Sequence, residues 1–397
     1  MSDPLLVLRR PPPGFVDDPW PHYGRLRDEA PVHAQPDGSM IVSRHATLAA
    51  IYRDTTRFSS DKRAVFAPIF GDSPLYRHHT TSLVFNDPPL HTRVRRIITG
   101  ALTPSAIARM EPGLVATVDG LLDELAGRDE ADLVEAFASR IPIEVIGNLF
   151  DMPPGERGPL RDWSLAILGA LEPAPSAGTL ARGNAAVEAF GAYLHGLADR
   201  RRARPGDPAT DVLTRLLRGE PDALDARTLV ENCIFILNAG HETTTNLIAS
   251  ALLTLDRLPV ERRRLIDAPA LLAAAVDEVL RLESPNQFGN RLSVEDVTLD
   301  GVRVPKGTNL HLCIGAANRD GRAFERPDEC VLDRHPNRHL AFAGGPHSCI
   351  GLSLARMEGR VAVGRFLGRF PDYRITAAAR SSRVRFRGFD SLRARLG

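Results

Sequence analysis

Long stretches of the chain space their apolar residues at helical intervals, and Pro/Gly breaks separate these stretches between about Thr103 and Leu280. The longest helix is predicted from an N-cap at Asp225 to about Leu258, where Pro259 stops it. Its apolar residues face several directions, so we expect a buried helix. A second helix is predicted over about 269–282.

Strand signals are shorter and lie outside this helical region. Residues 297–299 and 302–304 flank Asp300-Gly301, a pair typical of a hairpin turn, and residues 310–313 indicate a further strand. Residues 40–42 add another strand near Asp37-Gly38. Helical spacing returns from Ile350 to about Phe370.

These patterns together predict a mainly α fold with small β-sheets (α+β). No Gly/Ser tract, charge run or repeat marks an internal boundary, so we expect one domain over 1–397. Its helix-rich part spans about 85–285, and smaller β-rich parts span about 30–60 and 286–320.

Composition narrows the classes of partner. Lys+Arg number 50 and Asp+Glu 49, a net charge of +1, which gives no electrostatic footprint for nucleic acid or an anionic membrane. The apolar run 5–8 is too short for a signal peptide or a membrane span. We therefore expect a soluble, cytoplasmic protein without nucleic-acid or membrane partners.

Four cysteines stand at 233, 313, 330 and 349, without the paired spacing of zinc sites, iron–sulfur clusters or covalent haem attachment. Cys349 differs from the others because the Gly/Pro-dense segment 342–351 delivers it to the start of an apolar helix. Unpaired N–H groups at a helix start favour a thiolate, and glycines permit a flat ligand to approach the backbone closely. The alternative for a lone cysteine is a buried structural residue in a turn.

The middle of the longest helix breaks local propensity rules. Gly240 and the run Thr243-Thr244-Thr245 are poor helix formers in a helix predicted to be buried, and such violations tend to mark sites. Threonine hydroxyls can bond back to i−4 carbonyls and widen the helix. A simple kink is the alternative interpretation.

Two further pairs stand one helical turn apart, which places each pair on one helix face. Glu278 and Arg281 lie in an otherwise apolar helix, and His91 and Arg95 follow Asn86-Asp87-Pro88-Pro89. Taken singly, either pair is equally typical of a solvated helix face.

Taken together, these motifs resemble those of the cytochrome P450 family. Phe342, Gly345, Cys349 and Gly351 match its haem-ligand loop, Phe-x-x-Gly-x-x-x-Cys-x-Gly. The segment 239–243 is similar to its oxygen-activation motif, and Glu278-x-x-Arg281 is similar to its Glu-x-x-Arg motif. The agreement in order and spacing runs from Asp87 to Gly388.

The resemblance implies a triangular, mainly helical prism that holds haem b between the long helix and the helix after the cysteine. Cys349 would be the axial ligand of the iron. Glu242 and Thr243 would guide protons during dioxygen activation, and Arg334 would complete a structural group with Glu278 and Arg281. The implied cofactor-binding residues are Ala239, Gly240, Phe342, Gly345, Cys349 and Gly351, with His91, Arg95, Arg291 and His347 on the haem propionates.

The chain departs from the usual family pattern at four places. Ser348 stands where an aromatic residue often precedes the cysteine, and Ala343 stands where glycine is frequent. Cys330 and Val331 replace a common phenylalanine and a common aspartate in the segment that leads to Arg334.

The implied activity is insertion of one oxygen atom of O2 into a small-to-medium, mostly apolar organic substrate, by hydroxylation or oxidative dealkylation. No electron-transfer segment follows within the chain, so electrons are expected from a ferredoxin or flavodoxin with its reductase, and indirectly from NAD(P)H. The protein is expected to be a monomer. The rival classes are a non-oxygenating haem-thiolate enzyme (isomerase, dehydratase or nitric-oxide reductase) and a haem-based sensor.

Positions relative to the motifs suggest a substrate pocket, to which parts of 65–84 would also contribute. Its candidate residues are Phe235, Asn238, Ala239, Gln287, Phe288 and Phe386. Asn238 is a polar residue in a helix predicted to be buried, so it is expected either to bind a polar atom of the substrate or to serve helix packing. A basic docking face for the redox partner is expected from Arg93, Arg96, Arg338, Arg356 and Arg360, with a solvated arginine face as the alternative.

Overall fold

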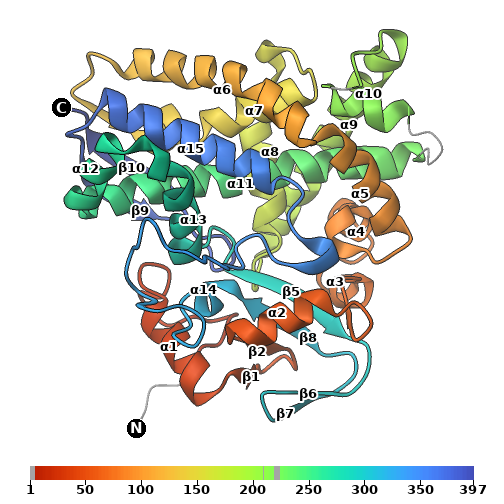
Figure 1. Cartoon of the computed structure of the whole chain (residues 1–397). Coiled ribbons are helices and arrows are strands. Elements are labelled where there is room, and N and C mark those ends of the chain that lie inside the picture. The colour runs from red at the N-terminus through yellow and green to blue at the C-terminus, as the bar shows by residue number, and fades with distance from the viewer. Residues whose placement is uncertain (1–4, 209, 219–223) are drawn as a thin grey trace.

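A computed structural model of the chain describes residues 5–208, 210–218 and 224–397. Helices dominate it, and most of them stack in one layer, whereas the largest sheet lies at the opposite end with the N-terminus (Figure 1). The α-helices are α1 Trp20–Glu29, α2 His45–Arg53, α3 Arg63–Phe70, α4 Pro74–Thr81, α5 Leu90–Ala101, α6 Pro104–Leu125, α7 Arg140–Leu149, α8 Leu160–Gly169, α9 Ala177–Ala203, α10 Val212–Arg218, α11 Ala226–Arg257, α12 Pro259–Asp267, α13 Leu272–Glu283, α14 Ile314–Ala317 and α15 Leu352–Arg369.

The predicted longest helix is confirmed as α11. Asp225 caps it by accepting a hydrogen bond from the Thr228 backbone N–H at 2.9 Å, and Pro259 follows its end. Apolar side chains bury most of its circumference against α7, α8, α9, α13 and α15. A helix buried on so many sides needs no single apolar stripe, as its sequence indicated. The helix predicted over about 269–282 is the turn Pro269–Leu271 followed by α13.

The strands in the described part of the chain form three small sheets. Their bounds are β1 Val32–Ala34, β2 Met40–Val42, β3 Phe58–Ser59, β4 Glu130–Asp132, β5 Phe288–Ser293, β6 Val297–Leu299, β7 Val302–Val304, β8 Asn309–Cys313, β9 Arg374–Arg380 and β10 Phe389–Arg395. The largest sheet has the order β1-β2-β8-β5-β3, in which β2 and β8 are parallel and the other neighbours antiparallel. The predicted hairpin is confirmed as β6 and β7, and Asp300 and Gly301 both have positive φ in its turn.

The third sheet, β4-β10-β9, was not predicted from the sequence. Most side chains of β9 are exposed, so the apolar alternation that marks a half-buried strand is missing there. The sheet matters for the site because the turn between β9 and β10 carries Arg383 and Arg385.

The remaining short helical turns are Leu83–Phe85, Val134–Ala138, Pro154–Glu156 and Gly345–His347. Among the residues that the structure describes, no helix combines the length and the apolarity needed to cross a membrane. Among the described residues, the apolar core has four buried clusters. The largest joins α6, α11, α13 and α15, and therefore fixes the two helices between which the site lies.

Candidate active site

The predicted ligand loop brings Cys349 to a point three residues before α15. The Cys349 backbone N–H donates to the Phe342 carbonyl at 2.9 Å, which closes the loop into a tight turn. Burial raises the pKa of the Cys349 thiol, although the Gly351 N–H and Arg95 act in the opposite direction. Cys349 nevertheless keeps exposed surface. A side chain that is exposed while protein surrounds it borders a hollow inside the molecule.

The glycines of this loop serve packing as well as any ligand. Gly345 has φ +65°, and a Cβ atom there would lie 2.2 Å from the backbone oxygen of Tyr52 in α2. The close approach that the sequence suggested for a flat ligand is therefore, at Gly345, an approach to protein backbone. Ala343 has φ 55°, a conformation that favours glycine, which explains why glycine is frequent at this position.

The middle of α11 has exposed surface of the same kind. Ala239 is exposed and Thr243 is half-buried, although the helix around them is buried. The Thr243 hydroxyl donates to the Ala239 carbonyl at 2.8 Å, the back-bond predicted for this segment. A Cβ atom on Gly240 would lie 2.5 Å from Ile146 Cδ1, so glycine there permits α7 to pack closely.

Glu242 points to another side of α11, where it lies at a cavity of about 810 Å³. Its carboxylate accepts a hydrogen bond from Arg383, and Arg383 also lies 3.4 Å from Glu172. Burial raises the pKa of Glu242, and Arg383 opposes this rise. Helix α8, the segment around Glu172, the β9–β10 turn and Arg9 also line the cavity, so both charged and apolar side chains surround it next to Glu242.

Nitrogen donors gather around the ligand loop. The rings of His91 and His347 lie 3.9 Å apart, and neither ring nitrogen of His91 has a hydrogen-bond partner among the described residues. Arg291 is likewise buried, and its Nη2 has no such partner. Burial first, and then neighbouring arginines, lower the pKa of His91 and bring that of His347 to about 3. Buried donors without acceptors fit the two propionates of a haem.

Arg95, the fourth predicted propionate donor, is engaged by the loop itself. It donates to the Ser348 carbonyl at 2.8 Å and to the Ser348 hydroxyl at 3.3 Å. Ser348, where the family often has an aromatic residue, thus ties α5 to the ligand loop.

The structure brings Arg334 onto the Glu278 and Arg281 pair. Arg281 donates to both oxygens of Glu278 at 2.8 Å, and Arg334 Nε lies 3.0 and 3.1 Å from the same two oxygens. Arg281 also donates to the carbonyls of Asn318, Pro327 and Glu329. These contacts tie α13 to the segment that leads into the ligand loop.

The predicted substrate-pocket residues have different surroundings. Asn238 is 2% exposed, and neither atom of its amide has a partner within the described chain. Phe235 is half-buried, while Phe386 lies under the Arg383 guanidinium at 4.9 Å. Gln287 donates to the last carbonyls of α13, and Phe288 packs edge-on against Tyr23 in the N-terminal core cluster. The side chains of Gln287 and Phe288 thus have protein partners of their own.

Sequence reasoning missed several charged residues near the site. Arg383 and Arg385 alternate in a hairpin turn, where arginines are typically solvated, and Glu172 lies in a Pro/Ala-rich loop. Glu358 in α15 is fully buried, which raises its pKa to about 8. No local pattern marks these residues, because their partners come from distant parts of the chain.

Comparison with known proteins identifies the family. The cytochrome P450 family model matches residues 179–371. Cytochrome P450 107B1 of Saccharopolyspora erythraea is 37% identical over 85% of this chain and 80% of its own length. Vitamin D(3) 25-hydroxylase of Pseudonocardia autotrophica is 35% identical over 90% of this chain and 88% of its own.

The fold agrees with solved structures of the same family. P450BioI in complex with an acyl carrier protein ligated to hexadec-9Z-enoic acid superimposes with a TM-score of 0.91, at 30% identity over 96% of this chain and 99% of that one. The predicted α+β prism is therefore confirmed. The chain belongs to the cytochrome P450 family, binds haem as that family does, and is one of its monooxygenases.

Proposed function

We propose that this protein inserts one oxygen atom of O2 into a small-to-medium, mostly apolar organic substrate, by hydroxylation or oxidative dealkylation. Electrons come singly from a ferredoxin or flavodoxin, whose reductase draws them from NAD(P)H. The protein works in the cytoplasm as a monomer. The observation that carries the proposal is that Cys349, and on α11 Ala239 and Thr243 next to Glu242, keep exposed surface while the residues around them are buried; we assign them to the two walls of one haem site.

Cys349 and the donors around the ligand loop have different roles in holding the haem. Bound haem supplies the activation of dioxygen, and Cys349 is the residue that holds its iron. His91, Arg291 and His347 receive the propionates, which supply the acceptors that these buried donors lack. Negative charge next to the two histidines offsets the repulsion from the neighbouring arginines.

The proton route uses this chain's own groups. The cavity of about 810 Å³ brings water to Glu242, whose raised pKa lets it take up a proton more readily than an exposed carboxylate. Thr243 takes the proton onward once its hydroxyl turns away from the Ala239 carbonyl. Arg383 holds Glu242 in place between transfers.

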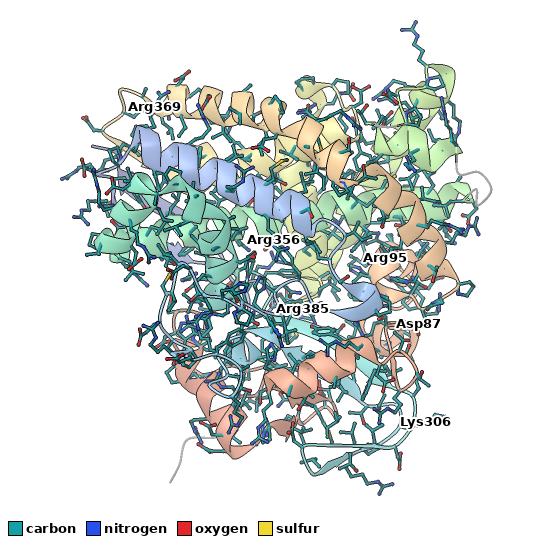
Figure 2. All side chains as sticks on the ribbon, in the orientation of Figure 1. Asp87, Arg95, Lys306, Arg356, Arg369 and Arg385 are labelled. Carbon is teal, nitrogen blue, oxygen red and sulfur yellow. The ribbon has the colours of Figure 1, made fainter. Side chains whose placement is uncertain are left out.

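The basic docking face for the redox partner is part of the proposal. Arg356 and Arg360 are half-buried in ion pairs with Asp277 and Glu111, and Arg338 is exposed. In the view of Figure 2, Arg356 and Arg95 both lie near the ligand loop. A cationic surface close to the haem edge suits an acidic electron donor.

Spectra and turnover test the proposal in sequence. The reduced, haem-loaded protein should give a carbon monoxide difference band of thiolate type, and Cys349→Ser should abolish it. With a surrogate ferredoxin and reductase, a substrate found by its low-to-high-spin shift should yield an oxygenated product. A rearranged or dehydrated product without oxygen consumption would favour the non-oxygenating alternative, and binding without any turnover would favour a sensor.

Asn238 gives a test of the substrate pocket. Its amide has no partner among the described side chains and backbone, so a polar atom of the substrate can satisfy it. Asn238→Leu should weaken substrate binding by about tenfold, which corresponds to one hydrogen bond. Unchanged affinity and regioselectivity would assign Asn238 to helix packing.

A further inference from the structure

A second group of basic side chains is not used by the propionate argument. Lys62 has no exposed surface, and its ammonium donates to Asn309 Oδ1 at 3.0 Å. Arg385 comes from the turn between β9 and β10, and in the view of Figure 2 it lies near the middle of the molecule. His311 on β8 and His79 on α4, whose pKa values burial lowers, complete this group, which we call the second basic group.

The backbone around Arg385 is held firmly. The Arg385 N–H donates to Glu172 Oε2 at 3.0 Å, and its carbonyl accepts from the Gln287 N–H at 2.8 Å. Its guanidinium has much less support. Nη1 donates to the Phe288 carbonyl at 3.3 Å, and the buried Nε has no partner among the described residues. The side chain keeps some exposed surface although surrounding protein lowers its pKa by desolvation, so it borders unfilled space inside the molecule, as Cys349 does.

Electrostatic effects link Arg385 to the rest of this group. Burial and then Arg385 bring the pKa of His311 to about 3. Burial, Arg291 and Arg385, in that order, lower the pKa of Lys62, so the propionate donor Arg291 acts on this group as well.

The second basic group has acids near it but no close ion pair. Asp87 and Asp61 act on Lys62, and Asp37 acts on His311. Within the described chain, neither Lys62 nor Arg385 forms an ion pair within 4.0 Å. Glu172 is the acid that acts most strongly on Arg385; its Oε2 accepts from two backbone amides, and its Oε1 lies 3.4 Å from Arg383 Nε. An arginine keeps its charge when buried, and a buried charge is costly unless an anion pairs with it. A carboxylate on a molecule that enters the hollow would supply a direct partner for Arg385.

Aromatic residues near Arg385 indicate what the bound molecule carries besides its carboxylate. The ring of His79 lies 5.4 to 5.7 Å from the rings of Phe66, Phe70 and Phe85. Phe386 follows Arg385 directly in the chain, and the centre of its ring lies 4.9 Å from the Arg383 guanidinium. An apolar body thus finds aromatic contacts close to a planar cation that can bind a carboxylate in bidentate fashion.

We propose that Arg385 binds the carboxylate of the substrate, with Lys62 adding positive potential, so that the substrate class is an organic acid with an apolar body. The inference rests on the proposed monooxygenase function and makes its substrate more specific. Arg385 is then a specificity-determining residue that takes no part in oxygen activation.

Matched ligands test this. Haem-loaded protein is titrated with decanoic acid and with methyl decanoate, and binding is followed by the spin shift and by calorimetry. The acid should bind at least tenfold more tightly than the ester. Arg385→Met, which keeps the bulk and removes the charge, should abolish the preference and leave ester affinity unchanged. Arg385→Lys should keep part of the preference for the acid. The control variant Arg303→Met, at an exposed arginine of β7, should change the affinity for neither the acid nor the ester.

The outcomes are distinguishable from failure of the proposed function. If the acid binds no more tightly than the ester, or neither ligand binds, the inference is overturned while a thiolate-type carbon monoxide band leaves the monooxygenase proposal standing. If Arg385→Met loses haem but its haem-containing fraction still prefers the acid, Arg385 serves the propionates and the inference is again wrong. If the band is absent, the proposed function fails, and calorimetry still decides whether Arg385 selects acids.

Discussion

At the scale of single residues, the site depends on side chains whose surroundings oppose their usual chemistry. Cys349 is surrounded by protein that raises its thiol pKa, so the thiolate needs the iron as its counter-charge. Glu242 has a raised pKa and a single cationic partner. In both cases the folded protein surrounds a group whose negative charge, on the thiolate or the carboxylate, a positive partner must balance during function.

Thr243 gives the first prediction. Thr243→Ala removes the hydroxyl next to Glu242, so less product should form per NAD(P)H and more hydrogen peroxide should be released. A positioned proton donor contributes about 10²-fold or more, and because water can partly replace it, we expect coupled yield to fall about tenfold. Thr245→Ala is the matched control, since Thr245 makes the same i−4 bond to His241 at 3.0 Å. Equal losses in both variants would assign the effect to the helix.

Glu358 gives a prediction on pH and stability. Its pKa is about 8 in the folded protein because of burial alone, against 4.5 for an exposed glutamate. Below pH 4.5 both states hold the proton. As pH rises from 4.5 to about 8, the unfolded chain releases the proton that the folded chain keeps, so the free energy of unfolding falls by about 1.4 kcal/mol per pH unit.

Glu358→Gln removes this dependence. Thermal denaturation should show the variant and the parent protein equally stable near pH 4.5. As pH rises to 8, the variant should become steadily more stable relative to the parent protein. A constant difference across this range would mean that a partner ionises or neutralises Glu358 in the folded protein.

At the scale of elements, close helix contacts explain residues that look unfavourable in isolation. Gly240 weakens α11 by its propensity, yet it lets Ile146 of α7 approach the helix. The Glu242 and Thr243 pair lies directly beyond this contact. The distance between α7 and α11 therefore influences how the pair is presented to the hollow.

Gly240→Ala tests the contact. The new Cβ would meet Ile146 Cδ1, and overpacking of this kind costs about 1–3 kcal/mol, against a gain of about 1 kcal/mol in helix propensity. We expect a net loss of stability in chemical denaturation. Adding Ile146→Val removes Cδ1 and should restore stability in the double variant. If Gly240→Ala alone is as stable as the parent protein, glycine at 240 serves the cofactor and not the packing.

At the scale of the whole molecule, the Glu278 group connects the helical part to the ligand loop. Arg281 has no exposed surface, and its donors reach three carbonyls in the segment between the sheet and Cys349. Removing one partner from a buried charge group leaves the other uncompensated. The group thereby couples the position of the cysteine to the core.

Arg334→Met should lower the free energy of unfolding by about 3 kcal/mol and reduce haem content in the purified protein. The control is Arg303→Met, which breaks an exposed ion pair with Asp296 and should cost less than about 1 kcal/mol. Comparable losses in the two variants would show that Arg334 contributes as an ordinary surface charge.

Local patterns in the sequence were enough to predict the class of the fold, the longest helix, the hairpin and the loop that presents Cys349. These features depend on local periodicity, caps, turn residues and short motifs, all of which lie within one segment of chain. The tertiary structure alone decided the pairing of Arg383 with Glu242, the burial of Glu358, and the position of Arg385 beside unfilled space inside the molecule. Such features depend on contacts between residues up to 213 positions apart, and the desolvation that shifts their pKa values exists only once the chain has closed around them.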